Sequence, residues 1–388
     1  MIEIADIFRK HGSSYLNQYS LNMLPSHKKA FTDILKCRTP IMGGKVYYCT
    51  DCKKYEYSYH SCGNRSCPKC QNDKANIWLE EKKQLLLPVN HFMVTFTIPE
   101  ELRDLVRSNQ KLFYSILFKA SSKTMEKLSL DSKYIGGKLG YIGIVHTWSR
   151  RLIYHPHVHY IVTGGGFSKE RNKWSRSRSN FLFPVKALSK IFKAKFRDEL
   201  EKRDPEIFHS TPTKVWNKSW VVNSIPVGKG ERALKYLAQY VFRIAISNSR
   251  IISLKNGVVT FSVRIHSEKY KDSKTKEWKI MSLKAEEFIR RYLQHVLPSG
   301  FVKVRYYGLF ASANRELLSK VRVQLGCKKL ESKEKGNPKK NFKCKDCKKK
   351  MVIVSIMPRY GSLNNKAPPI PENLFYNLSL KRSAKKIF

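Results

Sequence analysis

Two pairs of cysteines, Cys49-x2-Cys52 and Cys67-x2-Cys70, constrain the fold of this chain more than any other feature. Each pair presents two thiolates from one tight turn, and four thiolates complete the tetrahedral coordination of a zinc ion. Because thiolates at all four positions leave no open position for a substrate, the metal is expected to be structural. The sequence therefore predicts a zinc-binding module around residues 49–70.

Other residues near these pairs leave the ligand set open. Cys62, Cys37 and His60 are either bystanders or members of a two-zinc cluster that shares six cysteines, and Cys62 is the reserve ligand. Basic side chains around the module suit the binding of hairpin or duplex nucleic acid. These residues are Lys53, Lys54, Arg65, Lys69 and Lys74.

Three more cysteines lie near the C-terminus. Cys344-x2-Cys347 lies within a lysine-dense segment, residues 328–350, and Cys327 precedes that segment. The three thiolates are one fewer than a closed zinc site needs. They are either a second zinc knuckle or spare thiols in a basic tail.

The charge of the chain favours a polyanionic partner. Lysine and arginine number 75 against 30 aspartates and glutamates, a formal net charge of +45. The 20 tyrosines and 20 phenylalanines interleave with these cations, a combination that suits single-stranded nucleic acid, whose bases stack on rings. A merely basic soluble protein is the alternative. The residues expected to contact nucleic acid are Arg150, Arg151, Lys169, Arg171, Lys173, Arg176, Arg178, Lys235 and Arg243.

The sequence contains no sign of a membrane partner. No apolar run approaches the roughly 20 residues needed to span a bilayer, and the N-terminus lacks the plan of a secretory signal. We therefore expect a cytosolic protein, whose thiols stay reduced. Nine cysteines in such a chain indicate metal binding and not disulfides.

Helices and strands are expected to alternate along the chain. Residues 1–36 read as helical with a break at Pro25, and residues 71–87 read as a helix stopped by Pro88. The further expectations are a strand over 91–97, a helix from Pro99 to Phe118, a strand over 141–148, a basic loop over 168–180, a helix over 185–203, a strand over 215–224 ended by Pro226, a hairpin over 251–265 and a strand over 301–310.

The segment 154–162, YHPHVHYIV, reads as a loop that enters a strand. His157 and His159 share one face of that strand, because successive side chains alternate. Two imidazoles on one face of a stiff strand can clamp a divalent cation. The alternative is a pair of ordinary surface histidines. The run Gly164–Gly166 is expected to end the strand.

A divalent site needs more than two protein ligands. The connection Ser149–Tyr154 is short enough for an antiparallel hairpin, which would bring His146 beside His157 and His159. His146 is therefore the first candidate for the third ligand, with His155 and Gln239 as alternatives.

A helix is expected from about Gly230 to Ile246, and it carries two tyrosines. Tyr236 and Tyr240 lie one turn apart on a single face. An aromatic core stripe is the ordinary interpretation of this spacing. The sharper hypothesis is a pair of phenolic nucleophiles that attack a phosphate. Since the reference pKa of tyrosine is about 10, such a nucleophile needs help at neutral pH, which a metal at the histidines can supply.

These motifs together resemble a known family. The combination of C-x2-C, SCGNRSCPKCQ, HTW, HPHVH with a following glycine run, and YLAQY resembles the rolling-circle insertion-sequence transposases of the IS91 type. These belong to the HUH (His-hydrophobe-His) endonuclease superfamily. Residues 284–310 also resemble a segment of that family, and the likeness spans roughly residues 30–315 in the expected order.

The resemblance implies a site and a reaction. It implies His157 and His159 as ligands of Mg²⁺ or Mn²⁺, and Tyr236 and Tyr240 as candidate nucleophiles that nick and rejoin single-stranded DNA through a 5′-phosphotyrosine. Some relatives keep one tyrosine only, and Tyr240 is the choice if one acts. The expected substrates are single strands and the hairpin or duplex ends of a mobile element. No G-x4-G-K-[ST] motor motif is present, so unwinding is expected from a host helicase or the replication machinery.

The expected fold class is α+β, with a ferredoxin-like antiparallel sheet as the nuclease core. Three consecutive domains are expected. They are a helical and zinc-binding domain over 1–88, an HUH single-strand endonuclease domain over 89–315 and a basic extension with a second zinc knuckle over 316–388.

Three rival functions fit parts of the pattern. A rolling-circle replication initiator or relaxase-like nickase would share the same site. A non-catalytic zinc-dependent nucleic-acid-binding protein would explain the charge and the cysteines, but not the histidine strand and the tyrosine pair. A recombinase with two metals and an acidic triad needs converging carboxylates, which are scarce near His157.

Overall fold

The computed structural model describes residues 2–70, 78, 82, 85–229, 241, 244–266, 276–327 and 342–359. The chain divides into two compact units, and each combines segments that are distant in sequence. The first unit combines Met1–Leu35 with Asn64–Ser332, and the second combines Lys36–Gly63 with Lys333–Phe388. Within the described residues, no helix has the length and apolar character needed to span a bilayer.

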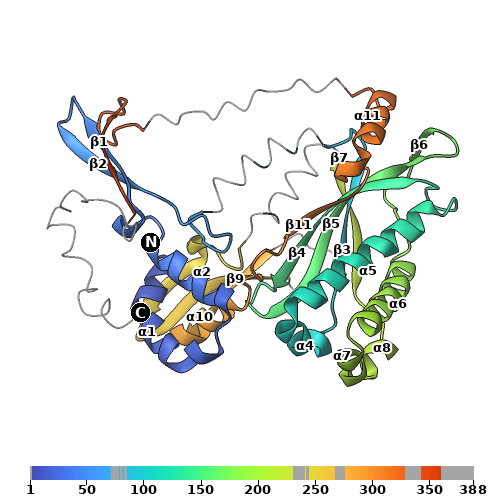
Figure 1. Ribbon diagram of the computed structural model, residues 1–388, viewed down its shortest axis with the longest axis horizontal. Coiled ribbons are helices and arrows are strands. Elements are labelled where there is room, and N and C mark those ends of the chain that lie inside the picture. Colours follow the sequence, from blue (N-terminus) through green and yellow to red (C-terminus); the bar gives the residue numbers. More distant parts are fainter. Residues whose placement is uncertain are drawn as a thin grey trace. The chain divides into compact units, whose positions relative to one another are not determined.

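An antiparallel sheet forms the centre of the first unit (Figure 1). Its strand order is β11-β4-β5-β3-β7, and β6 pairs with one end of β5. The α+β class with an antiparallel sheet, predicted from the sequence, is confirmed. The strands are β3 (Asn90–Thr97), β4 (Lys138–Trp148), β5 (Tyr154–Ser168), β6 (Lys173–Arg176), β7 (Val222–Lys229) and β11 (Val304–Gly308).

Two long helices, α5 (Gln110–Leu130) and α6 (Val185–Arg203), cover one face of this sheet (Figure 1). The predicted bounds of α6 are confirmed, and its buried residues recur every four positions as one stripe. The ring of Phe192 lies 4.9 Å from that of Phe96 on β3. The buried side chains of α6 therefore pack against the face of the sheet that α5 and α6 cover. The stripe consists of Leu188, Phe192, Phe196 and Leu200.

The helix predicted from Pro99 is divided into three pieces. They are η3 (Glu100–Leu102), α4 (Arg103–Ser108) and α5. Asn109 separates α4 from α5, with non-helical backbone angles and a side-chain amide that donates to the Leu105 carbonyl at 3.2 Å. Asparagine competes for backbone partners in this way, which explains the break.

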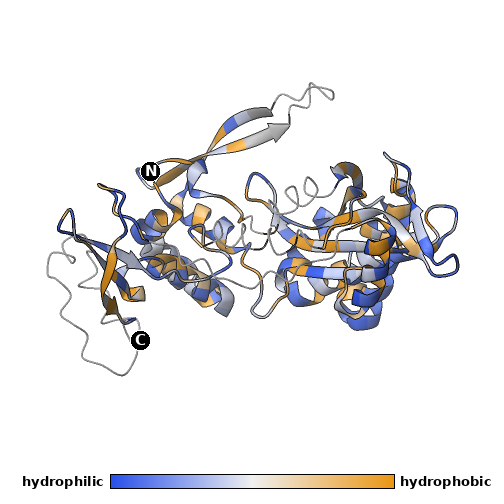
Figure 2. Ribbon diagram, turned by 90° about the horizontal axis from the view of Figure 1, so that it is seen from above, coloured by the Kyte–Doolittle hydropathy of each residue, from blue (hydrophilic) through white to orange (hydrophobic). Residues whose placement is uncertain are grey.

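The opposite face of the sheet carries its own apolar cluster. Met93, Ile144 and Ile161 meet there, and α11 (Arg315–Gln324) contributes Val321. Alternation along β5 places Ile161 on the same face as His157 and His159. Figure 2 shows hydrophobic positions recurring along the strands and on the helices packed against them.

The glycine run does not end the histidine strand, because β5 continues to Ser168. Gly165 has a φ of +149°, and a Cβ atom there would lie 2.5 Å from the Ser175 carbonyl oxygen and 2.7 Å from the Trp174 ring. The missing side chain lets β6 approach β5 closely. Glycine therefore permits strand pairing at this position and does not terminate it.

The strand expected over residues 215–224 has other bounds in the structure. Residues Lys214–Asn217 form a short helix, α8, and β7 begins only at Val222. Pro226 lies inside β7, opposite Phe92, next to a shift in register. The strand tolerates this proline because β7 is at the edge of the sheet, where a residue without an N–H can face away from the ladder.

The remaining elements of the first unit are helical and β-hairpin segments. Phe8 lies 5.1 Å from Phe31 and 5.6 Å from Tyr292, measured between ring centroids. The predicted N-terminal helices, the break before Pro25 and the hairpin over 251–265 are confirmed. These elements are α1 (Ile4–Tyr19), α2 (Pro25–Lys36), α7 (Pro205–Ser210), β8 (Ile251–Lys255), β9 (Val258–His266), β10 (Lys276–Lys284) and α10 (Ala285–Leu293).

The second unit is a three-stranded antiparallel sheet. Its order is β12-β1-β2, with β1 (Gly44–Cys49) in the middle, β2 (Lys54–Tyr59) on one side and β12 (Val352–Met357) on the other. The C-terminal strand is therefore part of the same compact unit as the N-terminal hairpin. The sequence predicts a separate extension after residue 315 instead. Pairing between strands about 300 residues apart leaves no local pattern, so the sequence could not show that β12 joins β1.

Candidate active site and metal centres

Three histidines converge on the sheet face opposite α5 and α6. His157 and His159 alternate along β5, and the register of the β4–β5 hairpin places His146 opposite His157. One nitrogen of each imidazole lies within 4.8 Å of the others. Within the described residues, this group contains no carboxylate. The predicted hairpin is confirmed, and the group can hold a metal ion.

Hydrogen bonds orient the rings of His157 and His159. The Nδ1–H of His157 donates to the carbonyl oxygen of His155 at 2.6 Å, so the Nε2 of His157 carries a lone pair when the ring is neutral. The Nδ1 of His159 lies 2.9 Å from the hydroxyl of Thr95 on β3. The two Nε2 atoms lie 3.0 Å apart. At that distance one ring can donate a hydrogen bond to the other, and a bound cation would take the place of the shared proton.

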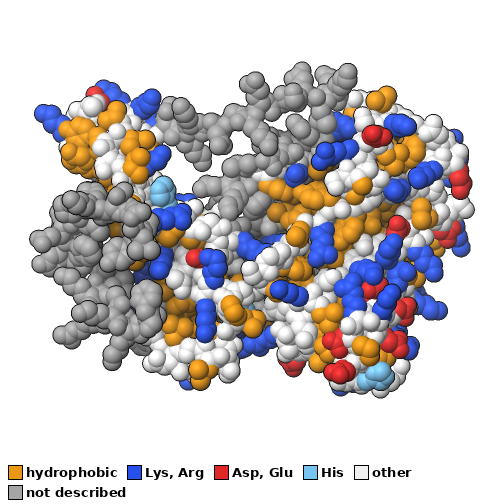
Figure 3. Space-filling model, viewed as in Figure 1, with side chains coloured by type: hydrophobic (Ala, Val, Ile, Leu, Met, Phe, Trp, Pro, Cys, Tyr) orange, Lys and Arg blue, Asp and Glu red, His pale blue; other side chains and the backbone are white. Residues whose placement is uncertain are grey.

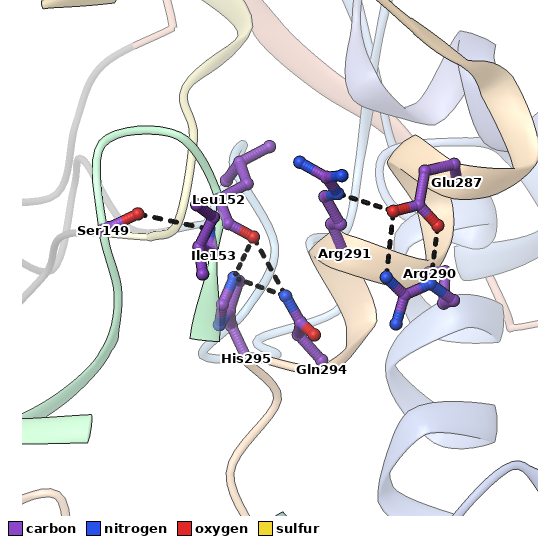
Figure 4. A network of polar contacts seen from close by, with 8 residues as sticks. All are labelled: Ser149, Leu152, Ile153, Glu287, Arg290, Arg291, Gln294 and His295. Atoms are coloured by element: carbon purple, nitrogen blue, oxygen red, sulfur yellow. Dashed lines mark hydrogen bonds and ion pairs between the residues drawn. The ribbon is translucent and has the colours of Figure 1, made fainter. Parts of the chain in front are cut away.

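The turn between β4 and β5 is anchored at the end of α10 (Figure 4). The carbonyl of Leu152 accepts hydrogen bonds from Gln294 at 2.9 Å and from His295 at 3.4 Å. Leu152 is fully buried and has a φ of +58°, and the Ser149 hydroxyl accepts the N–H of Ile153. These contacts hold a strained turn in one conformation. They thereby stabilise the register that aligns His146 with His157.

Trp148 and Lys303 extend the site beyond the histidines. The indole ring of Trp148 stacks on His146 at a centroid distance of 4.5 Å. The Lys303 amine lies 5.5 Å from the centre of the Trp148 ring and donates to the Val241 carbonyl at 2.8 Å. Burial of this amine, together with the charge of Arg65, lowers the pKa of Lys303 to about 7. Lys303 could not be identified from the sequence, because nothing in its local pattern distinguishes it from other lysines.

The predicted nucleophiles, Tyr236 and Tyr240, lie outside the described residues. The same is true of Gln239, an alternative metal ligand, and of Lys235 and Arg243. Val241 is described, and it packs into the apolar cluster on the sheet face that carries the histidines.

His155 is not part of the histidine group that can hold a metal. Its ring lies 5.1 Å from that of His157, but its Nδ1 accepts a hydrogen bond from Arg103 at 3.3 Å. Burial and the nearby Arg103 guanidinium lower the pKa of His155. Its carbonyl contributes instead, by orienting His157.

The cysteines form two groups, and neither is the predicted set. The structure does not bring the pair Cys49 and Cys52 together with the pair Cys67 and Cys70. In each group the four sulfur atoms lie within 4.8 Å of one another. Cys327 belongs to neither group within the described residues. The groups are Cys37, Cys62, Cys67 and Cys70, and Cys49, Cys52, Cys344 and Cys347.

A β-hairpin explains why the two predicted pairs separate. Strands β1 and β2 pair from Gly44–Tyr59 at the base to Cys49–Lys54 at the tip, with six residues in each strand. Six strand residues span about 20 Å, so the tip cysteines cannot reach ligands beyond the base. The alternating segment KYEYSY between the pairs is the sequence signal that would have revealed this hairpin.

Two basic residues that were expected to suit nucleic-acid binding, Arg65 and Lys69, make hydrogen bonds or ion pairs within the protein. Arg65 donates to the carbonyls of Leu297, Pro298 and Phe301 at 2.6–3.0 Å. Lys69 pairs with Glu3 at 2.6 Å. Arg65 therefore supports the loop that leads into β11.

The other expected contacts remain on the surface. Arg151 and the basic residues of 168–180 are exposed, and Arg150 is partly exposed. Part of that predicted loop is the strand β6. Figure 3 shows that lysine and arginine outnumber acidic side chains on the face that it presents.

Comparison with known proteins identifies the family. Residues 140–317 match a family described as "Putative transposase", and residues 7–98 match a "Transposase zinc-binding domain". "Putative transposase y4qJ" of Sinorhizobium fredii is 34% identical over 356 residues, which cover 87% of each chain. "Transposase for insertion sequence element IS801" of Pseudomonas savastanoi is 28% identical over 299 residues, 72% of this chain and 69% of the relative.

The zinc-binding match agrees with the chemistry of the cysteines. Thiolates select zinc over hard cations such as Mg²⁺, and the cysteine groups have the ligand number of a closed structural site. The two matched segments follow one another in the order that the motifs predicted. The chain therefore belongs to the family of IS91-type insertion-sequence transposases.

Proposed function

We propose that this transposase nicks and rejoins single-stranded DNA at the ends of its mobile element, in rolling-circle-type transposition. The observation that carries the proposal is the convergence of His146, His157 and His159 on one sheet face. This arrangement resembles the metal clamp of an HUH endonuclease, and the chain carries the tyrosine pair that such a reaction needs.

The covalent chemistry assigned to the chain is a transesterification. The phenolic oxygen of Tyr236 or Tyr240 attacks the scissile phosphorus and loses its proton. The bond from phosphorus to the 3′ oxygen breaks, and the 3′ oxygen leaves as a hydroxyl. The product is a 5′-phosphotyrosine, and attack by a 3′ hydroxyl on that link reverses the step without ATP.

The histidine group would hold the divalent cation, which when bound polarises the phosphate and stabilises negative charge on its oxygens. Three neutral imidazoles fit Mn²⁺ better than Mg²⁺, because nitrogen ligands suit transition metals. The hydrogen bonds at the Nδ1 atoms of His157 and His159 orient these ligands before any metal binds.

Val241, the described residue that follows Tyr240 in sequence, has contacts that lead to the histidine group. The Val241 carbonyl accepts a hydrogen bond from Lys303, whose amine lies near the Trp148 ring, and Trp148 stacks on His146. If one tyrosine is sufficient, we favour Tyr240.

The exposed cations are assigned to the DNA strand. Lys173, Arg176 and Arg178 lie on or beside β6, and a net charge of +45 would steer DNA to the protein. We assign unwinding to a host helicase or the replication machinery, and the site of action to the cytoplasm of the host cell.

The experiment is to incubate the full chain with Mn²⁺ or Mg²⁺ and a labelled single strand that carries the end of the element. A protein–DNA band that survives denaturation is expected, because the link is covalent. Tyr236→Phe/Tyr240→Phe and His157→Ala are expected to lose the band. Omission of the divalent cation should also remove it. A chelator is avoided, since it could strip the structural zinc and unfold the protein.

Two matched variants control this test. Tyr55→Phe removes an exposed phenol, and His209→Ala removes an exposed imidazole on α7, and both should keep the band. Binding of the strand without any covalent band in the wild-type protein would favour the non-catalytic nucleic-acid-binding alternative. Retention of the band in the double tyrosine variant would overturn the assignment of the nucleophile.

A further inference from the structure

Two six-residue segments at opposite ends of the chain have the same pattern. Residues 49–54 read CTDCKK and residues 344–349 read CKDCKK. Each segment forms a turn whose fifth residue has positive φ, +51° at Lys53 and +62° at Lys348. The N–H of Cys52 lies 3.5 Å from the sulfur of Cys49. This is the form of a zinc knuckle, in which backbone N–H groups surround a thiolate.

The two turns face each other within the second compact unit. The sulfur atoms of Cys49 and Cys347 lie 3.5 Å apart, and those of Cys52 and Cys344 lie 3.9 Å apart. In a tetrahedral site with Zn–S bonds of about 2.3 Å, neighbouring sulfurs lie about 3.8 Å apart. The four thiols therefore already stand at the spacing that zinc requires.

Contacts outside the cysteines repeat across the pair of turns. Lys54 pairs with Asp346 at 2.6 Å, and Lys349 pairs with Asp51 at 2.5 Å, so each turn supplies the same two charges to the other. These exposed ion pairs contribute little stability by themselves, but they fix the orientation of the turns. The ring of Phe342 stacks on Tyr47 at 4.2 Å, and β12 pairs with β1.

We propose that Cys49, Cys52, Cys344 and Cys347 bind one structural zinc ion that joins the C-terminal segment to the N-terminal hairpin. The zinc-binding match covers residues 7–98 and contains only half of these ligands. The site is distinct from the group of Cys37, Cys62, Cys67 and Cys70. Zinc at this position would link β12 to the β1–β2 hairpin, so the stability of the β12-β1-β2 sheet would depend on ligands from both segments. The sequence predicts a zinc knuckle from Cys327, Cys344 and Cys347, whereas the structure groups Cys344 and Cys347 with the first turn and, among the described residues, does not include Cys327.

The test is the zinc content of the full chain, measured by elemental analysis per mole of protein. Wild-type protein is expected to hold two equivalents. Cys344→Ser/Cys347→Ser should hold one, and Cys327→Ser, which changes a cysteine outside both groups, should hold two. Two equivalents in the Cys344→Ser/Cys347→Ser variant would overturn the proposal.

A second measurement uses the wild-type protein and does not depend on the folding of a variant. Zinc is withdrawn with a graded chelator, and the cysteines that become alkylated are identified by mass spectrometry. The four proposed ligands should become reactive together, although nearly 300 residues separate the two pairs. Alkylation of Cys344 and Cys347 at the rate of Cys327, while Cys49 and Cys52 stay protected, would refute a shared ion.

Discussion

Lys303 shows how burial can change the charge of a single residue. The side chain is partly exposed, but its amine is enclosed next to Trp148 and donates to the Val241 carbonyl at 2.8 Å. Burial lowers the pKa of the amine to about 7, and Arg65 acts in the same direction. A lysine in an unfolded chain has a pKa of about 10.4. Between these two values the unfolded state binds the proton and the folded state does not.

This difference predicts a pH dependence. As pH rises from 7 to 9, the free energy of unfolding of the wild type should rise by about 1–2 kcal/mol relative to Lys303→Met, because the penalty for burying the charge disappears. Urea unfolding at pH 7, 8 and 9 measures the difference. Three histidines with lowered pKa values do not interfere, since desolvation lowers the pKa of His27 and His91 to about 4 and that of His295 to about 3.

Lys173→Met is the matched control, because it removes a lysine from an exposed position on β6. Its stability should follow the wild type across the same pH range. Parallel curves for the wild type and Lys303→Met would show that the amine is not enclosed as described.

The strand β5 shows how glycine acts at the level of an element. Sequence rules assign Gly164–Gly166 to the end of a strand, yet the strand continues through them, because their missing side chains admit β6. The rule is correct about the backbone freedom of glycine but contains no information about the neighbouring strand. The hairpin of β4 and β5, by contrast, was expected from the short connection between them, and its register places His146 opposite His157.

Gly165→Ala is expected to destabilise the first unit. The new methyl group would lie 2.5 Å from the Ser175 carbonyl oxygen, which overpacks the β5–β6 pair. Gly300→Ala is the control, since its φ of +71° imposes strain but no atom lies within 4 Å of the new Cβ. The free energy of unfolding should fall by about 1–3 kcal/mol more in Gly165→Ala than in the control. Chemical denaturation measures both, and equal losses would contradict the close approach of β6.

At the scale of the whole molecule, charge dominates the expected interaction with DNA. The triple variant Lys173→Gln/Arg176→Gln/Arg178→Gln keeps a net charge of +42, since 45 less 3 is 42. If each cation contacts a phosphate of a single strand, the slope of log affinity against log salt should become less steep by about 2. Fluorescence anisotropy at several salt concentrations measures the slope.

A second triple variant separates local contact from total charge. Lys186→Gln/Lys190→Gln/Lys202→Gln removes the same charge from exposed positions on α6. Its slope should change less, because general steering does not depend on individual contacts. Equal slopes in the two variants would argue against a DNA contact at β6.

The sequence by itself determined the features that depend on neighbours along the chain. The alternation at His157 and His159, the bounds of α6 and the paired cysteines of each turn are local patterns, so they could be read directly. Only the tertiary structure decided which turns share a metal. A hairpin separates Cys52 from Cys67 and β12 returns Cys344 to the hairpin tip, and contacts between residues so far apart leave no periodic trace in the sequence.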